Sequence, residues 1–135
     1  MGETAPAVGA DGAANGFTAL TAKFTALQRA AGALVEEAER LAVRMRANAN
    51  AAVELADLNA AAEVDPRHIA RTADIGEAFG RVVGGCKALQ GAADTVHTAA
   101  GNVKAAHQAE YGPTHAAVTA SRARQAKPGF YRPLL

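Results

Sequence analysis

The sequence is poor in the residues that build β-sheet cores and covalent crosslinks. Among its 135 residues there is no tryptophan, and phenylalanine and tyrosine together number six. Strands draw heavily on aromatic and β-branched residues, so the composition disfavours a sandwich or a barrel. The single cysteine, Cys86, forms no internal disulfide and supplies no thiolate cage for a metal.

Long apolar runs, strong net charge and catalytic motifs are also missing. No stretch of about 18 uninterrupted apolar residues provides a membrane span, and no basic segment followed by an apolar run marks a secretory signal, so we expect a cytoplasmic protein. The formal net charge of +1 gives no general attraction to nucleic acid. Phosphate-binding, nucleophile-elbow and zinc-protease motifs are absent. The sequence therefore predicts a protein that is not an enzyme and takes no cofactor, metal or small-molecule substrate.

Alanine is what the sequence has in excess. It accounts for 37 of the 135 residues, more than half of the apolar ones. Alanine is the best helix former and has almost no side-chain bulk, so the composition predicts long helices that pack closely within one all-α domain.

Two stretches carry apolar residues at alternating steps of three and four, the spacing that keeps one stripe of a helix facing a partner. The first stripe predicts a helix from residue 17 to about 62. The second predicts another helix of similar length, and two such helices joined by a short turn pack antiparallel. The first stripe comprises Phe17, Leu20, Phe24, Leu27, Ala31, Leu34, Ala38, Leu41, Met45, Asn48, Ala52 and Leu55, and the second comprises Ile75, Phe79, Val82, Cys86, Leu89, Ala93, Val96, Ala100, Val103 and His107.

The boundaries follow from proline and glycine. Asp65 precedes Pro66 and so avoids the helical region, while its carboxylate can cap a helix that has Pro66 in its first position; the turn is predicted at 63–65. Gly112-Pro113 is predicted to end the second helix, with a short third helix from about Thr114 to Gln125. We expect a disordered leader at residues 1–16, a helical domain at 17–126 and an extended tail at 127–135.

A ridge of small residues at Gly76, Gly80 and Gly84 continues along the second helix through Ala88 and Ala92. It either seats the alanine-rich face of the first helix or forms a groove for another molecule, and the first interpretation is preferred. A two-helix hairpin with alanine in its stripes buries little area, so we expect it to self-associate or to dock on another helical protein.

Three features of the sequence have both a structural and a functional interpretation: a pair of histidines, an asparagine and the cysteine. His107 and His115 flank the predicted break and, with Glu110, form a weak metal signal, so solvated or partly buried histidines are the preferred interpretation. Asn48 in the first stripe either fixes the register of a partner helix or lies at the rim. Cys86 is interpreted as a small buried apolar residue.

The C-terminal segment is the one asymmetry of charge. Residues 113–135 carry four basic residues and no acidic one, with two aromatic residues among them: Arg122, Arg124, Lys127, Phe130, Tyr131 and Arg132. Such a tail suits docking on an acidic protein surface or on a nucleic-acid backbone. It can also fold back on the acidic stretch around Glu36, Glu37 and Glu39, or remain solvated.

Three short motifs resemble those of a known family. They are Met45-Arg46-Ala47-Asn48-Ala49-Asn50 late in the first helix, Tyr111-Gly112 after a histidine-containing segment, and Lys127-Pro128-Gly129-Phe130-Tyr131 near the end. Together they look like small alanine-rich helical proteins of streptomycetes and related actinobacteria that are labelled conjugal transfer proteins. The resemblance spans about residues 17–131 and implies an accessory role in transferring a plasmid or integrative element, with no catalytic residues.

The leading hypothesis is therefore a non-enzymatic helical interaction protein that acts through its stripes and serves the transfer of a mobile element. Two alternatives stay open. One is a nucleic-acid accessory factor that uses the basic tail, with its aromatic residues stacking on bases. The other is a secreted or phage-associated structural hairpin.

Overall fold

The computed structural model describes residues 15–123, which form two helices, α1 (Phe17–Ala61) and α2 (Pro66–Ala120). The described part of the chain has no strand, and the prediction of an all-α fold with two long packed helices is confirmed. Neither helix carries a window apolar enough to cross a membrane over these residues. The predicted tail at 127–135, and the leader apart from its last two residues, lie outside the described range.

The turn between the helices has the chemistry that the sequence predicts. α1 ends in a Schellman-type arrangement, in which the amide of Val64 donates to the carbonyl of Asn59 (3.0 Å) and Glu63 has a φ of 54°. Asp65 then caps α2, because its Oδ1 accepts from the backbone amide of Arg67 at 2.9 Å. Pro66 occupies the first helical position, where its missing N–H costs nothing.

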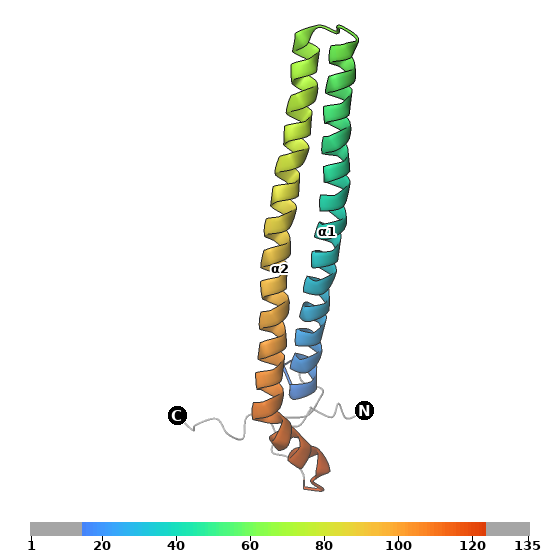
Figure 1. Ribbon diagram of the computed structural model, residues 1–135. Helices are drawn as coiled ribbons and strands as arrows, with labels where there is room; N and C mark the ends of the chain where they lie inside the picture. Colours follow the sequence, from blue (N-terminus) through green and yellow to red (C-terminus); the bar gives the residue numbers. More distant parts are fainter. Residues whose placement is uncertain (1–14, 124–135) are drawn as a thin grey trace, which may run out of the picture. The chain divides into compact units, whose positions relative to one another are not determined.

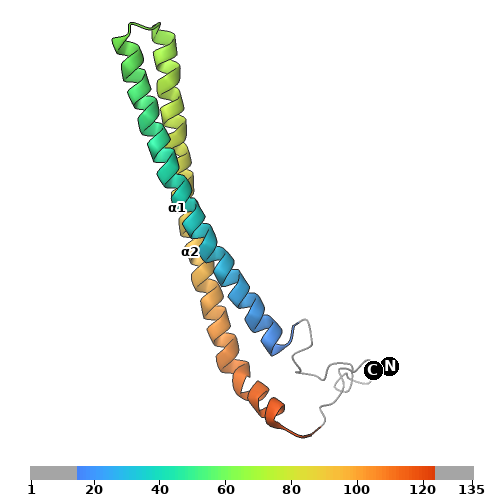
Figure 2. The ribbon, with the colours of Figure 1, turned by 90° about the vertical axis from the view of Figure 1, so that its right-hand side faces the viewer.

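The chain divides into two compact units, and each contains a segment of both helices. The turn unit comprises residues 30–96, which include the turn itself. The described part of the terminal unit comprises residues 15–29 and 97–123. Within each unit a segment of α1 lies beside a segment of α2 and runs in the opposite direction (Figure 1, Figure 2).

The fully buried positions between the two helices of the turn unit, which we call the seam, hold only small residues, while Val35, Met45, Phe79 and Val83 are half-buried at the same heptad positions. No described side chain larger than cysteine is buried. The register is set where Gly76 meets α1: a Cβ on this glycine would lie 3.4 Å from the Cβ of Ala52 and 3.5 Å from the carbonyl oxygen of Ala49. The buried seam residues are Ala31, Ala38, Ala42, Ala52 and Ala56 of α1 and Gly76, Cys86 and Ala93 of α2.

Only alternate members of the predicted stripes lie in the seam. Ala38 and Ala52 of the first stripe are buried, as are Cys86 and Ala93 of the second. The stripe members between them point outward, and their places in the seam are taken by residues one position later, such as Ala42 and Ala56. The sequence predicts that every member of each stripe packs against the other helix, and the structure places only every second member there. Alanine at the later positions lets the backbones approach more closely than leucine or valine would.

The terminal unit is held by rings and by hydrogen bonds between the helices. The ring of Phe17 stacks on His107 and on His115, with centroids 4.9 and 4.5 Å apart. His97 Nδ1 lies 2.9 Å from the backbone oxygen of Gln28, to which it donates, and His97 Nε2 lies 3.5 Å from the amide nitrogen of the Gln28 side chain. These contacts are specific in geometry, in contrast with the alanine seam.

The predicted helix end at Gly112-Pro113 is wrong. α2 continues through both residues to Ala120, so residues 114–120 belong to α2 and no separate third helix is seen between residues 15 and 123. Pro113 removes one helical hydrogen bond, and the last turns of α2 tilt away from its preceding turns (Figure 1). The ring of Phe17 contacts histidines on both sides of this proline, which supports the helix across the break.

Candidate interaction surface

A row of large apolar side chains lies on the outside of the turn unit, and we call it the outer row. On α2 these side chains recur at every seventh residue and are 42% to 53% exposed, the extremes being Val82 and Ile75. On α1 two leucines are similarly exposed, Leu41 is half-buried and Asn48 is exposed. The outer row comprises Leu34, Leu41, Asn48 and Leu55 of α1 and Ile75, Val82, Leu89 and Val96 of α2.

The two halves of the outer row lie on the same face of the unit. In each helix every outer-row residue comes one position before a seam position. The row is therefore rotated from that seam position by about 100°, and the direction of rotation is the same in α1 and α2. Two antiparallel helices are related by a two-fold axis perpendicular to the plane that contains them. That axis leaves each face in place, and equivalent positions of α1 and α2 therefore share one face.

The opposite face of the turn unit is polar and small. Its positions on α1, one residue after the first stripe's buried members, include Glu39 and Arg46, and those on α2 include Lys87 and Asp94. Val53 is the one large apolar residue among them and is 56% exposed. Large apolar side chains are therefore more numerous on the face of the outer row than on the other face, where Val53 and Val43, each 56% exposed, stand among charges and glycine. A solvated hairpin has no need of such asymmetry.

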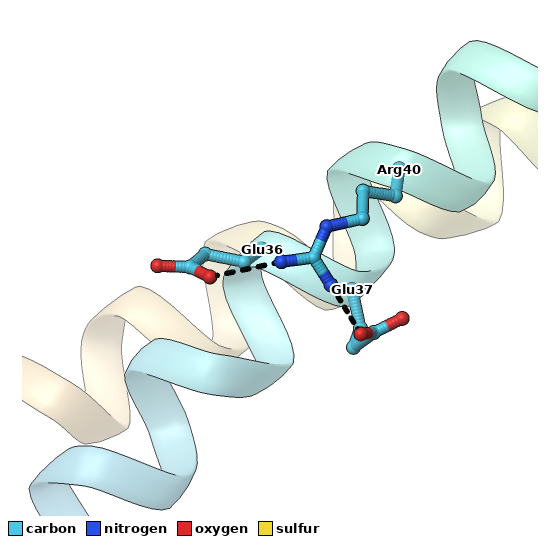
Figure 3. Close-up of polar contacts among 3 residues, drawn as sticks. All are labelled: Glu36, Glu37 and Arg40. Carbon is cyan, nitrogen blue, oxygen red and sulfur yellow. Dashed lines mark hydrogen bonds and ion pairs between the residues drawn. The ribbon is translucent and has the colours of Figure 1, made fainter.

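Charges cover the outer surface of α1, and among them Glu37 and Arg44 lie beside the outer row. Arg40 binds Glu36 at 3.1 Å and also binds Glu37, one turn away on the same exposed surface (Figure 3). These three residues, with Glu39, Val43 and Arg44, line a shallow open hollow of about 740 Å³. Each partner of these ion pairs is more than half exposed, so the pairs contribute little stability. Their effect is on the local charge, because Arg40 neutralises part of the acidic stretch on which the basic tail could fold back.

The ridge of glycines does not form one continuous surface. Gly76 lies in the seam, whereas a Cβ on Gly80 or Gly84 would meet nothing within 4 Å. Steps of four residues advance by about 400°, so such a ridge winds around the helix and leaves the seam after one turn. The preferred interpretation, seating against α1, describes Gly76, and the other two glycines face open space.

The remaining predicted positions are placed as follows. Cys86 is a buried free thiol in the seam. Asn48 is exposed and lies within the outer row between Leu41 and Leu55. Arg122 is exposed at the end of the described range, while Arg124, Lys127, Phe130, Tyr131 and Arg132 lie outside it.

Two histidines belong to a cluster of aromatic rings that the sequence pattern did not predict. His107 and His115 lie against Phe17, and His107 also contacts the rings of Phe24 and Tyr111. His107 Nε2 donates to the backbone oxygen of Phe17 at 3.3 Å. No group of three potential metal ligands occurs between residues 15 and 123. The two histidines are eight residues apart, a spacing that places both on the same side of a continuous helix. The sequence predicted a helix end at Pro113, so this spacing could not be used.

Comparison with known proteins identifies no relative of this chain: no protein-family model, no curated protein and no solved structure matches it.

Proposed function

We propose that this protein is a non-enzymatic helical interaction protein whose binding surface is the outer row of the turn unit. The observation that carries the proposal is the recurrence of an exposed valine, leucine or isoleucine at every seventh residue from Ile75 to Val96. A row of this kind is typical of the seam between packed helices. Here it has no covering element within the described residues, and leucine and valine gain free energy when they leave water.

The chemistry of the surface supports the same role. Side chains that carry out acid–base or nucleophilic catalysis converge with polar partners in a pocket, whereas the outer row is mostly apolar and exposed. Interfaces between proteins have an apolar centre with a charged rim, and the outer row bordered by Glu37 and Arg44 has that composition.

The experiment compares one substitution on each face of the turn unit. Val82→Glu places a charge on the outer row at a residue that is 42% exposed, and Val53→Glu places the same charge on the polar face at a residue that is 56% exposed. The two variants and the unaltered chain are produced in the native host and crosslinked in cells. We expect Val82→Glu to lose the crosslinked complexes and Val53→Glu to retain them. Complexes that survive Val82→Glu in a folded protein would remove the outer row as the binding surface.

We further propose that this binding serves the transfer of a plasmid or integrative element. The support is the resemblance carried by the segment from Met45 to Asn50 and by Tyr111-Gly112. Deleting the gene from a donor strain is expected to lower the transfer frequency, and the unaltered gene is expected to restore it. An unchanged frequency would reject this role while leaving the binding surface as an independent question.

A further inference from the structure

We infer that the occupant of the outer row is a second copy of this chain, packed row against row about a two-fold axis that passes beside Leu41. Neighbouring helices of the two copies then run antiparallel, and the turns of the paired units lie at opposite ends. This inference rests on the proposed function, because it names the partner of the same surface. Its arguments are the area of the row, its register and the charges that border it.

The area of the outer row matches half of an ordinary protein interface. From their exposed fractions, its apolar side chains present about 500 Å² in the turn unit. A standard interface buries about 800 Å² on each partner, of which about 56–65% is apolar, or roughly 500 Å². One copy of the row covering another therefore gives an interface of ordinary size without any further element.

The register of the hairpin places the centre of the outer row on α1 and its centre on α2 at the same height, so one two-fold axis can pass beside both. Ala49 and Ala52 lie level with Gly76, because a Cβ on this glycine would approach both residues. The helices are antiparallel, so each residue moved back along α1 corresponds to one residue moved forward along α2. Leu41 therefore lies level with about residues 84–87. The midpoint between Val82 and Leu89 falls within that range. A two-fold axis at this level faces Leu41 with its own copy.

The same axis pairs the α2 residues of the row with one another. Val82 meets Leu89 of the second copy, and Ile75 meets Val96. Asn48 meets Leu34 of the second copy, since the two residues lie one heptad on either side of Leu41. A surface that pairs with itself in this way is the requirement for a closed symmetric dimer, which is the commonest assembly of identical chains.

The bordering charges are arranged with the same symmetry. Glu37 and Arg44 occupy equivalent positions one heptad apart beside the outer row, and they lie on opposite sides of Leu41 along α1. The two-fold axis brings Glu37 of each copy near Arg44 of the other. Arg40 can retain Glu36 when this happens, because it contacts both glutamates. The alternative arrangement, with both turns at one end, sets α1 on α2 of the second copy and places Glu37 opposite Gly85 and Ala92, where no charge answers it.

Sedimentation of the full chain tests whether a second copy is the occupant. We expect the unaltered protein to be a dimer, Val82→Glu a folded monomer, and Val53→Glu a dimer. Helicity from circular dichroism shows whether each variant is folded, and Val96→Glu provides a second outer-row variant should Val82→Glu unfold. A monomer at every concentration up to the solubility limit would overturn the inference.

Crosslinking through single cysteines tests the position of the axis. In a Cys86→Ala background, Leu41→Cys is expected to form a disulfide-linked dimer upon oxidation. Leu55→Cys is the matched control on the same row. It lies 14 residues from the axis, so its two copies are about 40 Å apart and remain unlinked. A dimer in which Leu41→Cys stays unlinked would overturn the proposed arrangement.

Charge exchange tests the rim of the interface. Glu37→Arg and Arg44→Glu each place like charges together and are expected to raise the dissociation constant of the dimer by about two- to fivefold, in line with an exposed ion pair. The double variant restores opposite charges and is expected to return the constant to its original value. Additive weakening in the double variant would reject the Glu37–Arg44 pairing.

The outcomes separate this inference from the proposed function. If the unaltered protein is a monomer while Val82→Glu still abolishes the complexes in cells, the outer row binds a different protein and only the inference fails. If Val82→Glu leaves both the dimer and the cellular complexes intact, the outer row is not a binding surface and both proposals fail.

Discussion

The two units use the same pair of helices but different interactions to hold them together. In the turn unit the buried seam residues are alanine, one glycine and one cysteine, and every large apolar side chain is half-buried or exposed. In the terminal unit, Phe17 stacks on two histidines, and His97 bonds to Gln28 across the helices. Close backbone approach permits an interface without large side chains, but it leaves those side chains to bury elsewhere. The comparison therefore explains why the turn unit carries the candidate surface.

The largest expected effect is on the alanine seam. Ala38→Leu inserts three carbon atoms where two backbones approach closely, and we expect it to lower the free energy of unfolding by about 2–3 kcal/mol. Ala47→Leu, at an exposed position of the same helix, is the control and should change it by less than about 0.5 kcal/mol. Urea unfolding at one fixed protein concentration measures both. Equal effects would show that the seam is not tightly packed.

The aromatic contacts of the terminal unit are the next test. Phe17→Ala removes both histidine stacks, and we expect a loss of about 2 kcal/mol, less than for a fully buried phenylalanine because Phe17 is half-buried. Hydrogen exchange should accelerate at amides between residues 97 and 115, and rates between residues 30 and 96 should stay unchanged. Val103→Ala, at a side chain of the same unit that is 49% exposed, is the control. Uniform acceleration across both units would contradict their separate stabilisation.

The hydrogen bonds of His97 provide a smaller effect in the same unit. His97→Ala removes the bond to the Gln28 carbonyl and the contact with its side-chain amide, and we expect a loss of about 1 kcal/mol. The control is His68→Ala, at an exposed histidine of the turn unit, which should have almost no effect. Thermal unfolding of the two variants side by side measures the difference. A larger loss for His68→Ala would refute the assignment.

Glycines in the two units should respond to alanine with different results. Gly84→Ala in the turn unit meets nothing within 4 Å and should raise the stability by about 0.5–1 kcal/mol through helix propensity. Gly101→Ala in the terminal unit places a Cβ 3.0 Å from the side-chain amide nitrogen of Gln28. The gain in stability from helix propensity should therefore be reduced or reversed at this position. Urea unfolding of both variants decides the point. Equal gains would mean that Gln28 moves aside without loss.

The smallest effect is the pH dependence of the turn. Hydrogen bonds from the side chain and the backbone of Arg67 lower the pKa of Asp65 below its ordinary value of 3.8. A lowered pKa in the folded state means that the carboxylate stabilises the fold above pH 3.8 and that this contribution is lost as the pH falls through the folded-state value. Asp65→Asn should flatten that part of the stability curve. An unchanged acid slope in Asp65→Asn would show that ionisation of Asp65 contributes nothing to stability, since asparagine also caps helices.

Local sequence features predicted the helices and the turn well. Asp65-Pro66 predicted the start of α2 because a cap and a proline act on adjacent residues. Gly112-Pro113 misled for the same local reason: a proline breaks a helix unless distant residues support it, and Phe17 lies far away in sequence. The outer row was visible as part of a stripe, but its separation from the seam was not, because leucine and valine satisfy both positions equally.

The sequence by itself determined that this protein is helical, that two helices are joined near residue 64, and that apolar residues recur at heptad spacing. These properties follow from propensity, capping and periodicity, which act within a few turns of helix. The tertiary structure decided which side of each stripe faces the other helix. That choice depends on how closely two backbones can approach, which the small seam residues permit, as where Gly76 meets Ala49 and Ala52, and it leaves Ile75, Val82, Leu89 and Val96 exposed.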